Sequence, residues 1–341
     1  MNIYGDARWR GSHGIGRFAT QVLQLCPEIT PLELAGRPVD AQDPLRLALA
    51  LRRLPSESIF FSPGYNPPLV SRQPCVLTLH DLNHIDRPEN SSMAKRLFYR
   101  VVLRPACRRA ARLLTVSEYS RQRIVAWAGV PPEKVVNVGN GVDSSFRPAE
   151  ALPARAGQGY LLCVGNRKGH KNEFRVVEAF ARAPLPLAVR LRFTGRPTTA
   201  LLRHAARCGV LDRVDFTGPL DDGQMPALYR GALALVFPSL YEGFGLPVLE
   251  SMACGTPVIA ANTTALPEVA GDAALLVDPL SVTAIAAAIR RLVADDALRA
   301  TLRARGLERA AGFTWERTAA TVRRVLEEIA HLKVRRQDAA A

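Results

Sequence analysis

The sequence predicts an α/β protein of two domains, each a doubly wound parallel sheet with helices on both faces. The chain has 341 residues, and one domain typically has roughly 100–200. Short apolar runs alternate with amphipathic stretches of helical length, which is the pattern of repeated βαβ units. The runs are continuously apolar, as strands covered on both faces of a parallel sheet require.

The expected strands fall into two groups along the chain. Those of the first half lie at 59–61, 75–79, 113–116 and 135–136. Those of the second half lie at 160–164, 189–193, 234–237, 258–260 and 274–277. Ligands of such sheets bind beyond the carboxyl ends of the strands, so polar segments at those ends are the candidate sites.

A linker is expected between the two halves. Residues 146–159 contain two prolines and two glycines and show little strand character. We therefore place the N-terminal domain at 1–150 and the C-terminal domain at 151–314. A helix at 315–332 and a disordered tail at 333–341 are expected to follow.

The composition indicates a folded protein of a reducing compartment. Hydrophobic residues make up 48% and charged residues 22% of the chain, values ordinary for globular proteins. No run of about 18 apolar residues suggests a transmembrane helix, and residues 1–16 lack the apolar core of a signal peptide. The six cysteines form no CxxC pair or cluster, which disfavours structural zinc and a disulfide framework. A cytoplasmic location is expected.

The net charge of +14 is unusually high and is concentrated in one segment. Between Lys95 and Arg123 only one residue, Glu118, is acidic. Pro105 is expected to divide this segment into two helices. A solvated helix face and contact with anionic phospholipid both explain the charge, whereas nucleic acid is disfavoured because no binding module is recognisable. Basic side chains recur every four residues at Arg96, Arg100, Arg104 and Arg108.

A glycine-rich segment, residues 11–18, opens a helix near the N-terminus. Glycines let the backbone approach an anion closely, and a helix start offers N–H groups. The segment is neither GxGxxG nor a P-loop. A plain glycine turn explains it equally well.

A basic loop, residues 165–172, directly follows an expected strand. It contains Arg167, Lys168 and Lys171 with two glycines. Arginine can bind two oxygens at once and lysine supplies a compact charge, which suits a diphosphate. A solvated basic loop is the alternative.

Two carboxylates stand eight residues apart in the segment 237–257. Glu242 lies in a glycine-rich loop, and Glu250 lies on a helix that is expected to begin near Pro247 and end near Gly255. The helix dipole favours an acid near its start and so offers a structural explanation for Glu250 alone. Loop amides and two carboxylates together suit the hydroxyls of a sugar.

A histidine segment follows the strand at 75–79. His80, His84 and Asp81 could be metal ligands, but no further ligand with suitable spacing is evident. A histidine at a strand end that donates a hydrogen bond to a ligand is the other interpretation, and we prefer it.

Around Glu242 the sequence resembles the retaining glycosyltransferases of family 4, which have the GT-B fold of two Rossmann-like domains facing across a cleft. Their E-x7-E signature is matched by Glu242 and Glu250 within EGFGLPVLE. The chain is most similar to bacterial mannosyl- and rhamnosyltransferases of surface-polysaccharide synthesis, and the resemblance covers nearly all of it. Further matches, in order, are GIGRF, TLHD, TVSEYSR, NVGNGVD, CVGNRKGHKN, LPEVAGDAALLVDP and FTWERTA.

The resemblance implies a donor site for a nucleoside-diphosphate sugar in the C-terminal domain. Glu250 would accept hydrogen bonds from the ribose, and Glu242 would lie against the donor sugar. Lys171 matches the family's phosphate-binding lysine, and either Arg167 or Lys168 matches its arginine. Backbone amides would reach the sugar hydroxyls and the distal phosphate from Gly243, Phe244, Gly245 and Leu246.

The resemblance also implies contacts outside that loop. Gly14 and Gly16 would meet the diphosphate, and His80 matches a histidine near the transferred sugar. Leu220 lies in a loop similar to the one that meets the base. The helix at 315–332 would return to the N-terminal domain. The residues expected to act in catalysis are thus Glu242, His80, Arg167 and Lys171.

The implied chemistry needs no metal or other cofactor. Negative charge grows on the leaving diphosphate as the glycosidic bond breaks, and cations and amides aimed at it stabilise the transition state. No D-x-D metal motif occurs in the sequence. The family retains the anomeric configuration, so front-face attack is expected, with the departing phosphate taking the acceptor proton. Closure of the domains would exclude water.

The acceptor and the donor base are less directly indicated. Resemblance favours GDP-mannose as donor and a lipid-linked or oligosaccharide acceptor in polysaccharide or O-antigen synthesis. The basic segment then suggests peripheral binding to the anionic cytoplasmic face of the inner membrane, and no nucleic acid.

Two other classes of function are alternatives. A sugar-nucleotide epimerase or a phosphorylase could share the fold, but E-x7-E with GFGLP argues against the first and the lack of a pyridoxal-phosphate lysine motif against the second. A non-enzymatic protein that binds anionic surfaces would explain the charge but would leave Glu242 without a role.

Overall fold

The computed structural model describes residues 2–148 and 159–338, without the side chains of 333–338. It divides into an N-terminal unit, Met1–Gly141 with Thr314–Ala341, and a C-terminal unit, Val142–Phe313. The division therefore precedes the expected boundary at 150. Residues 142–148 pack on the C-terminal unit, where the Val142 amide donates to the Phe313 carbonyl over 3.1 Å. Most of the expected linker, residues 149–158, lies outside the described residues.

The N-terminal unit contains a parallel sheet of six strands within the described residues, in the order β2-β1-β3-β4-β5-β6. The four strands expected from apolar runs are confirmed, and two three-residue strands, β1 and β2, were not predicted. The strands are β1 (Ile3–Gly5), β2 (Ile29–Pro31), β3 (Ile59–Ser62), β4 (Cys75–Thr78), β5 (Arg112–Thr115) and β6 (Val135–Asn137).

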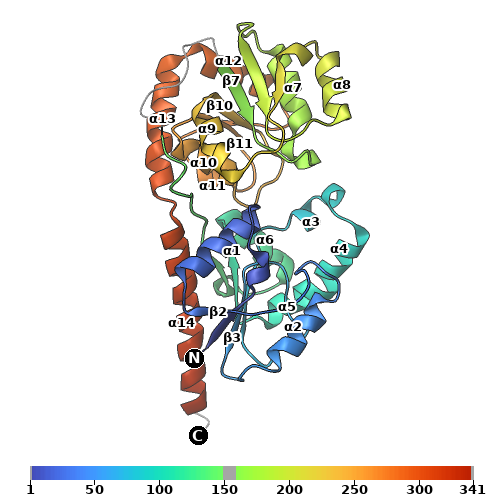
Figure 1. Ribbon diagram of the computed structural model, residues 1–341, viewed down its shortest axis with the longest axis vertical. Coiled ribbons are helices and arrows are strands. Elements are labelled where there is room, and N and C mark those ends of the chain that lie inside the picture. Colours follow the sequence, from blue (N-terminus) through green and yellow to red (C-terminus); the bar gives the residue numbers. More distant parts are fainter. Residues whose placement is uncertain (1, 149–158, 339–341) are drawn as a thin grey trace. The chain divides into compact units, whose positions relative to one another are not determined.

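Helices cover both faces of this sheet. Figure 1 shows α1 and α14 side by side on one face and α2 and α5 on the other. One buried cluster joins Leu47 of α2, Cys107 of α5 and Ile124 of α6 to strands β3 and β4. The helices are α1 (Gly14–Leu25), α2 (Asp43–Leu51), α3 (Asn83–Asp86), α4 (Met93–Phe98), α5 (Arg104–Arg109), α6 (Glu118–Ala128) and α14 (Trp315–Asp338).

The basic segment contains the expected second helix, with Pro105 in its first turn, but no break separates it from the first. A π-helical turn at Tyr99–Leu103 joins α4 to α5, so the backbone stays helical through Pro105. Proline near the first turn of α5 needs no hydrogen bond of its own, and the wider π turn accommodates the missing donor.

The C-terminal unit contains a second parallel sheet, with six strands in the described residues and the order β12-β11-β10-β7-β8-β9. The five expected strands are confirmed, and the three-residue β9 was not predicted. The strands are β7 (Gly159–Cys163), β8 (Val189–Phe193), β9 (Val214–Phe216), β10 (Ala232–Phe237), β11 (Val258–Ala261) and β12 (Leu275–Val277).

Apolar side chains from α7, α8 and α12 form one core with this sheet. Val177, Leu201 and Ile289 are among its members. The helices of this unit are α7 (Glu173–Arg182), α8 (Thr199–Arg207), α9 (Met225–Arg230), α10 (Leu246–Ala253), α11 (Leu266–Ala270), α12 (Val282–Ala294) and α13 (Asp296–Ala311). Both units thus have the doubly wound, Rossmann-like architecture that the GT-B expectation requires.

The C-terminal helix belongs to the N-terminal unit. Arg323 of α14 donates to the Leu25 carbonyl at the end of α1 over 2.7 Å, and Cys26 approaches the Ala319 carbonyl at 3.6 Å. The helix continues to Asp338, beyond the expected end at 332, so residues 333–338 are helical rather than a tail. No helix in the described ranges combines the length and apolar character of a membrane span.

Candidate functional site

The strand order of each sheet reverses at one point. The reversal lies between β1 and β3 in the N-terminal unit and between β7 and β10 in the C-terminal unit. Open α/β sheets bind ligands beyond the carboxyl ends of the strands at such points. Gly14 and Gly16 follow β1, Lys171 follows β7, and Glu242 follows β10. Most of the expected site residues therefore lie at these two reversals.

Lys171 and Glu242 are brought together although 71 residues separate them. The lysine Nζ donates to Oε1 of Glu242 over 2.6 Å, and each side chain is 14% exposed. Nζ also lies 4.9 Å from the ring centroid of Phe237, at the end of β10. A largely buried pair of this kind is less screened by salt than a surface pair. A cation for a phosphate and an acceptor for a hydroxyl thus stand side by side.

The loops that carry this pair are bonded to each other. The Asn172 side-chain amide donates to the carbonyls of Pro238 and Pro279 over 2.9 and 2.7 Å. The Leu240 amide donates to the His170 carbonyl over 2.7 Å. The backbone on either side of the Lys171–Glu242 pair is therefore held by tertiary contacts, not by the sequence of either loop alone.

Left-handed backbone also concentrates here. Among the described residues, three that are not glycine have positive φ: Arg167 (63°), Asn172 (62°) and Thr264 (59°). This geometry is costly for a β-branched residue, and it persists where surrounding contacts hold it. Thr264 follows β11, and its Oγ1 accepts a hydrogen bond from the Glu242 amide at 3.2 Å. The strained residues thus hold the loops around the Lys171–Glu242 pair.

Arg167 has a structural role that the sequence did not reveal. It pairs with Glu173, which is only 5% exposed, over 2.5 Å. Burial raises the pKa of Glu173, and the nearby Arg167 charge opposes that rise. Of the two candidate phosphate ligands, Lys168 is the exposed one. The remaining bonds of the Arg167 guanidinium go to the carbonyls of Thr194 and Arg196.

Glu250 lies on α10, which begins and ends as predicted. Pro247 is in its first turn, and Gly255 follows its end with φ 72°. The Glu250 side chain is buried, 4% exposed, and its Oε2 accepts a hydrogen bond from the hydroxyl of Tyr229 at 2.7 Å. Sequence reasoning missed Tyr229, because nothing in the local pattern of α9 marks it as a partner of α10.

The glycine loop before α10 packs its aromatic side chain inward. Phe244 is 6% exposed and lies edge-on to Phe313 at 5.9 Å. Gly245 has φ 110°, a conformation that a side chain would strain. The backbone at 243–246 therefore remains the part of the loop suited to meet a ligand. Leu220 lies after β9, at half exposure.

His13 caps the helix that the N-terminal glycines open. The His13 Nδ1 accepts a hydrogen bond from the Gly16 amide over 3.0 Å. A Cβ on Gly16 would lie 2.5 Å from the Gly11 carbonyl oxygen, so this glycine is required for close packing. The expected contact of the Gly16 amide with a diphosphate would compete with His13, whereas Gly14 lies at the first turn.

His80 is buried, 7% exposed, and its Nε2 lies 2.9 Å from the Pro63 carbonyl oxygen. Since a carbonyl only accepts, Nε2 carries the proton and Nδ1 is an acceptor in the neutral ring. Burial lowers the pKa of His80 to about 4. His80 is thus suited to accept a hydrogen bond from a hydroxyl, and not to donate one to a ligand as expected, because its N–H donates to the Pro63 carbonyl. The described residues contain no group of three potential ligands for a metal.

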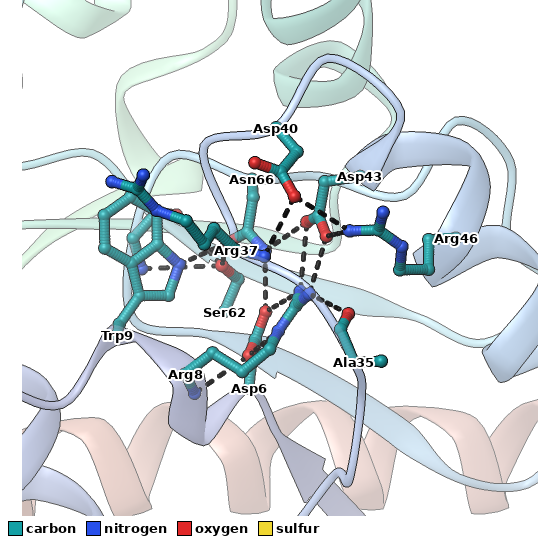
Figure 2. A network of polar contacts seen from close by, with 11 residues as sticks. Asp6, Arg8, Trp9, Ala35, Arg37, Asp40, Asp43, Arg46, Ser62 and Asn66 are labelled. Atoms are coloured by element: carbon teal, nitrogen blue, oxygen red, sulfur yellow. Dashed lines mark hydrogen bonds and ion pairs between the residues drawn. The ribbon is translucent and has the colours of Figure 1, made fainter.

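A buried polar network follows β1 and β3 (Figure 2). The Arg8 guanidinium lies between Asp6 and Asp43, at 2.7 and 2.6 Å, and both carboxylates are fully buried. The Asn66 side-chain amide donates to the same two carboxylates and accepts from Trp9 Nε1. The network fixes the loop that leads to His13 and the loop after β3 that carries Pro63. Sequence reasoning did not identify it.

The expected basic face is partly realised. Arg96, Arg100 and Arg108 are exposed, whereas Arg104 is only half exposed, beyond the π-helical turn. Arg108 Nε donates a hydrogen bond to the Ala128 carbonyl over 2.7 Å. Beside the arginines the helix exposes three apolar side chains at a spacing of four residues: Met93 (79%), Leu97 (60%) and Val101 (60%).

Comparison with known proteins shows the family of the chain. Residues 16–146 match the family described as Glycosyltransferase Family 4, and residues 148–309 match Glycosyl transferases group 1. O-antigen chain mannosyltransferase B of Escherichia coli is 35% identical over 289 residues, which cover 80% of this chain and 74% of that protein. A serotype-specific mannosyltransferase WbdA of Escherichia coli is 30% identical over 62% of this chain and 28% of its own length.

Solved structures share the fold at low sequence identity. Sucrose-phosphate synthase of Thermosynechococcus elongatus has a TM-score of 0.76 at 20% identity, covering 96% of this chain and 98% of that one. Anabaena HepE in complex with UDP and glucose has a TM-score of 0.76 at 19% identity, covering 96% and 99%. WaaG, a glycosyltransferase of lipopolysaccharide biosynthesis, has a TM-score of 0.71 at 16% identity, covering 94% and 98%.

Proposed function

Since the chain belongs to the group 1 glycosyltransferases of family 4, we propose that it transfers mannose from GDP-mannose to a lipid-linked or oligosaccharide acceptor in bacterial O-antigen or polysaccharide synthesis. The Lys171–Glu242 pair carries the proposal, because it joins a phosphate ligand to a sugar ligand at the strand reversal. The choice of mannose is supported by the names of the two relatives reported above, both of which are mannosyltransferases.

The donor would displace the internal ion pair when it binds. Its diphosphate would take the Lys171 ammonium, and Glu242 would accept hydrogen bonds from sugar hydroxyls in exchange. Charge grows on the leaving phosphate in the transition state, so a cation already held beside it lowers the barrier without reorganisation. Lys168 is the exposed cation of the same loop and would add to this charge.

The reaction would proceed without a metal, since Lys171, Lys168 and backbone amides would supply the positive charge at the diphosphate. His80 would act as a neutral hydrogen-bond acceptor for a hydroxyl, because its Nε2 proton is held by Pro63. No side chain is needed as a nucleophile if the departing phosphate takes the acceptor proton.

A lipid-linked acceptor would place the enzyme at an anionic membrane surface, on the cytoplasmic face of the inner membrane. The exposed residues of α4 and the π turn support this part of the proposal, since Arg96 and Arg100 lie beside Met93, Leu97 and Val101. Cationic and apolar side chains on one helix are typical of interfacial binding.

Calorimetry with GDP, UDP, ADP and dTDP in the presence of EDTA tests the proposal. One diphosphate is expected to bind. Glu250→Gln should weaken its binding about ten-fold or more, because hydrogen bonds to a charged group are lost. Glu308→Gln, at an exposed position on α13, is the control and should bind as the wild type does. Mannose transfer from GDP-mannose is then measured without metal. Absence of binding by every diphosphate would contradict the donor site.

A further inference from the structure

We infer that Tyr229 is a positioning residue for the nucleotide sugar, because its hydroxyl holds the Glu250 carboxylate in the orientation that receives the ribose. The inference rests on the proposed function, in which Glu250 is the ribose ligand. It adds a residue from another helix, α9, that touches no reacting atom and acts only through Glu250.

The contact between the two side chains is buried at both ends. Tyr229 is fully buried and Glu250 is 4% exposed, and the phenol oxygen lies 2.7 Å from Oε2. An ionised carboxylate only accepts, so the tyrosine hydroxyl is the donor. A charge-assisted hydrogen bond of this kind is among the stronger ones in proteins, and a buried carboxylate requires such donors.

Tyr229 is itself held by its surroundings. The Thr256 hydroxyl donates to the Tyr229 carbonyl over 2.7 Å, in a buried position. The ring of Phe146 lies edge-on to the tyrosine ring, with centroids 5.9 Å apart. The hydroxyl is therefore placed by packing, and it can define the plane of the carboxylate that it bonds. Locked supporting groups of this kind make a binding site specific.

The chemical consequence is recognition of the ribose hydroxyls. A carboxylate that is turned away from its binding orientation loses their hydrogen bonds in the ground state and the transition state alike. Loss of the tyrosine hydroxyl should therefore raise KM for the nucleotide sugar and leave kcat nearly unchanged. It should also reduce the preference for ribonucleotides over nucleotides that lack these hydroxyls.

The experiment compares GDP with 2′,3′-dideoxy-GDP by calorimetry on the wild type and Tyr229→Phe. GDP is expected to bind about ten-fold more weakly to the variant, and dideoxy-GDP is expected to bind within two-fold of its wild-type affinity. UDP and 2′,3′-dideoxy-UDP are measured in parallel, so the result does not depend on the base. The ratio of the two affinities, ribonucleotide to dideoxynucleotide, is measured on one preparation of each variant. Partial unfolding of a variant affects both affinities equally and cancels in this ratio.

Tyr160→Phe is the matched control. Its hydroxyl donates to the carbonyl of Leu228, the residue before Tyr229, over 2.6 Å. Tyr160→Phe should lower the free energy of unfolding by a similar amount and leave the ribose preference unchanged. An unchanged preference in Tyr229→Phe, or equal weakening of both nucleotides, would overturn the inference while the proposed donor site stands. If the wild type binds neither ribonucleotide, the proposed function fails as well.

Discussion

Replacement of Arg8 by methionine should strongly destabilise the N-terminal unit. Arg8 is the cation between Asp6 and Asp43, and both carboxylates have no exposed surface. Burial alone would lower the pKa of Arg8, but its hydrogen bonds to the two carboxylates outweigh burial and raise it. Removing one partner from a buried charged group costs about 3–5 kcal/mol. Methionine keeps the apolar stem, so little of this cost comes from a cavity.

The remaining contacts of the two carboxylates determine how much folding free energy the Arg8→Met variant loses. Asp43 keeps a second cation, Arg46, at 3.5 Å, and Asn66 still donates to both carboxylates. Asp6 keeps only neutral donors among the contacts that the structure gives it. We therefore expect about 4 kcal/mol, of which Asp6→Asn in the same background should restore roughly 1–2 kcal/mol by removing one of two facing charges.

Tryptophan fluorescence in urea measures this unit selectively. The three tryptophans of the chain, at 9, 127 and 315, all belong to the N-terminal unit. Arg123→Met is the control, because its pair with Asp86 is 43% exposed on the arginine side and should be worth less than about 1 kcal/mol. A cost for Arg8→Met no larger than the control, or a double variant no more stable than the single one, would refute the reasoning.

Three further predictions concern pH, the diphosphate and the membrane. Unfolded His80 protonates near pH 6.5, whereas burial holds its folded pKa near 4; stability should thus be full above pH 6.5 and fall by about 3 kcal/mol toward pH 4. Urea unfolding midpoints of the wild type and His80→Gln, measured across this pH range, test the prediction. It would be contradicted if the midpoints of both proteins changed with pH in the same way. Lys171→Met should weaken GDP about ten-fold and guanosine less than two-fold, by calorimetry. The double variant Leu97→Ser, Val101→Ser should bind phosphatidylglycerol vesicles about ten-fold more weakly in a sedimentation assay. Leu187→Ser, at an exposed position of the C-terminal unit, is the control and should bind as the wild type does. Equal binding of the wild type to neutral vesicles would contradict an anionic surface.

The fold could be predicted where apolar runs are long enough to show. Every expected strand is present, from β3 to β12. The strands that were missed are β1 (IYG), β2 (ITP) and β9 (VDF), and each contains a glycine, a proline or an aspartate, residues that are depleted in strands and that interrupt an apolar run. The structural division after Gly141 precedes the expected boundary at 150 for a different reason. Phe146 looks like the start of a linker, but its ring packs on Tyr229, a contact that only the folded chain contains.

The basic helix shows the limit of periodicity. A spacing of four places the arginines on one face of an α-helix, and Pro105 suggests a break. The π turn at Tyr99–Leu103 keeps the helix continuous and leaves Arg104 half exposed. The sequence indicates an amphipathic segment, but it cannot show whether the apolar face has a partner, and the exposure of Leu97 and Val101 is visible only in the structure.

The site could be predicted as residue types in loops, but not as contacts. Arg167 and Lys168 belong to one loop and were the two alternatives for the arginine that binds phosphate together with Lys171. What separates them is Glu173, a carboxylate that burial leaves in need of a cation and that Arg167 reaches at 2.5 Å. Lys171 meets Glu242 instead, across the reversal between β7 and β10. Charge in a loop therefore indicates phosphate binding only after the acids that the fold brings to it have been counted.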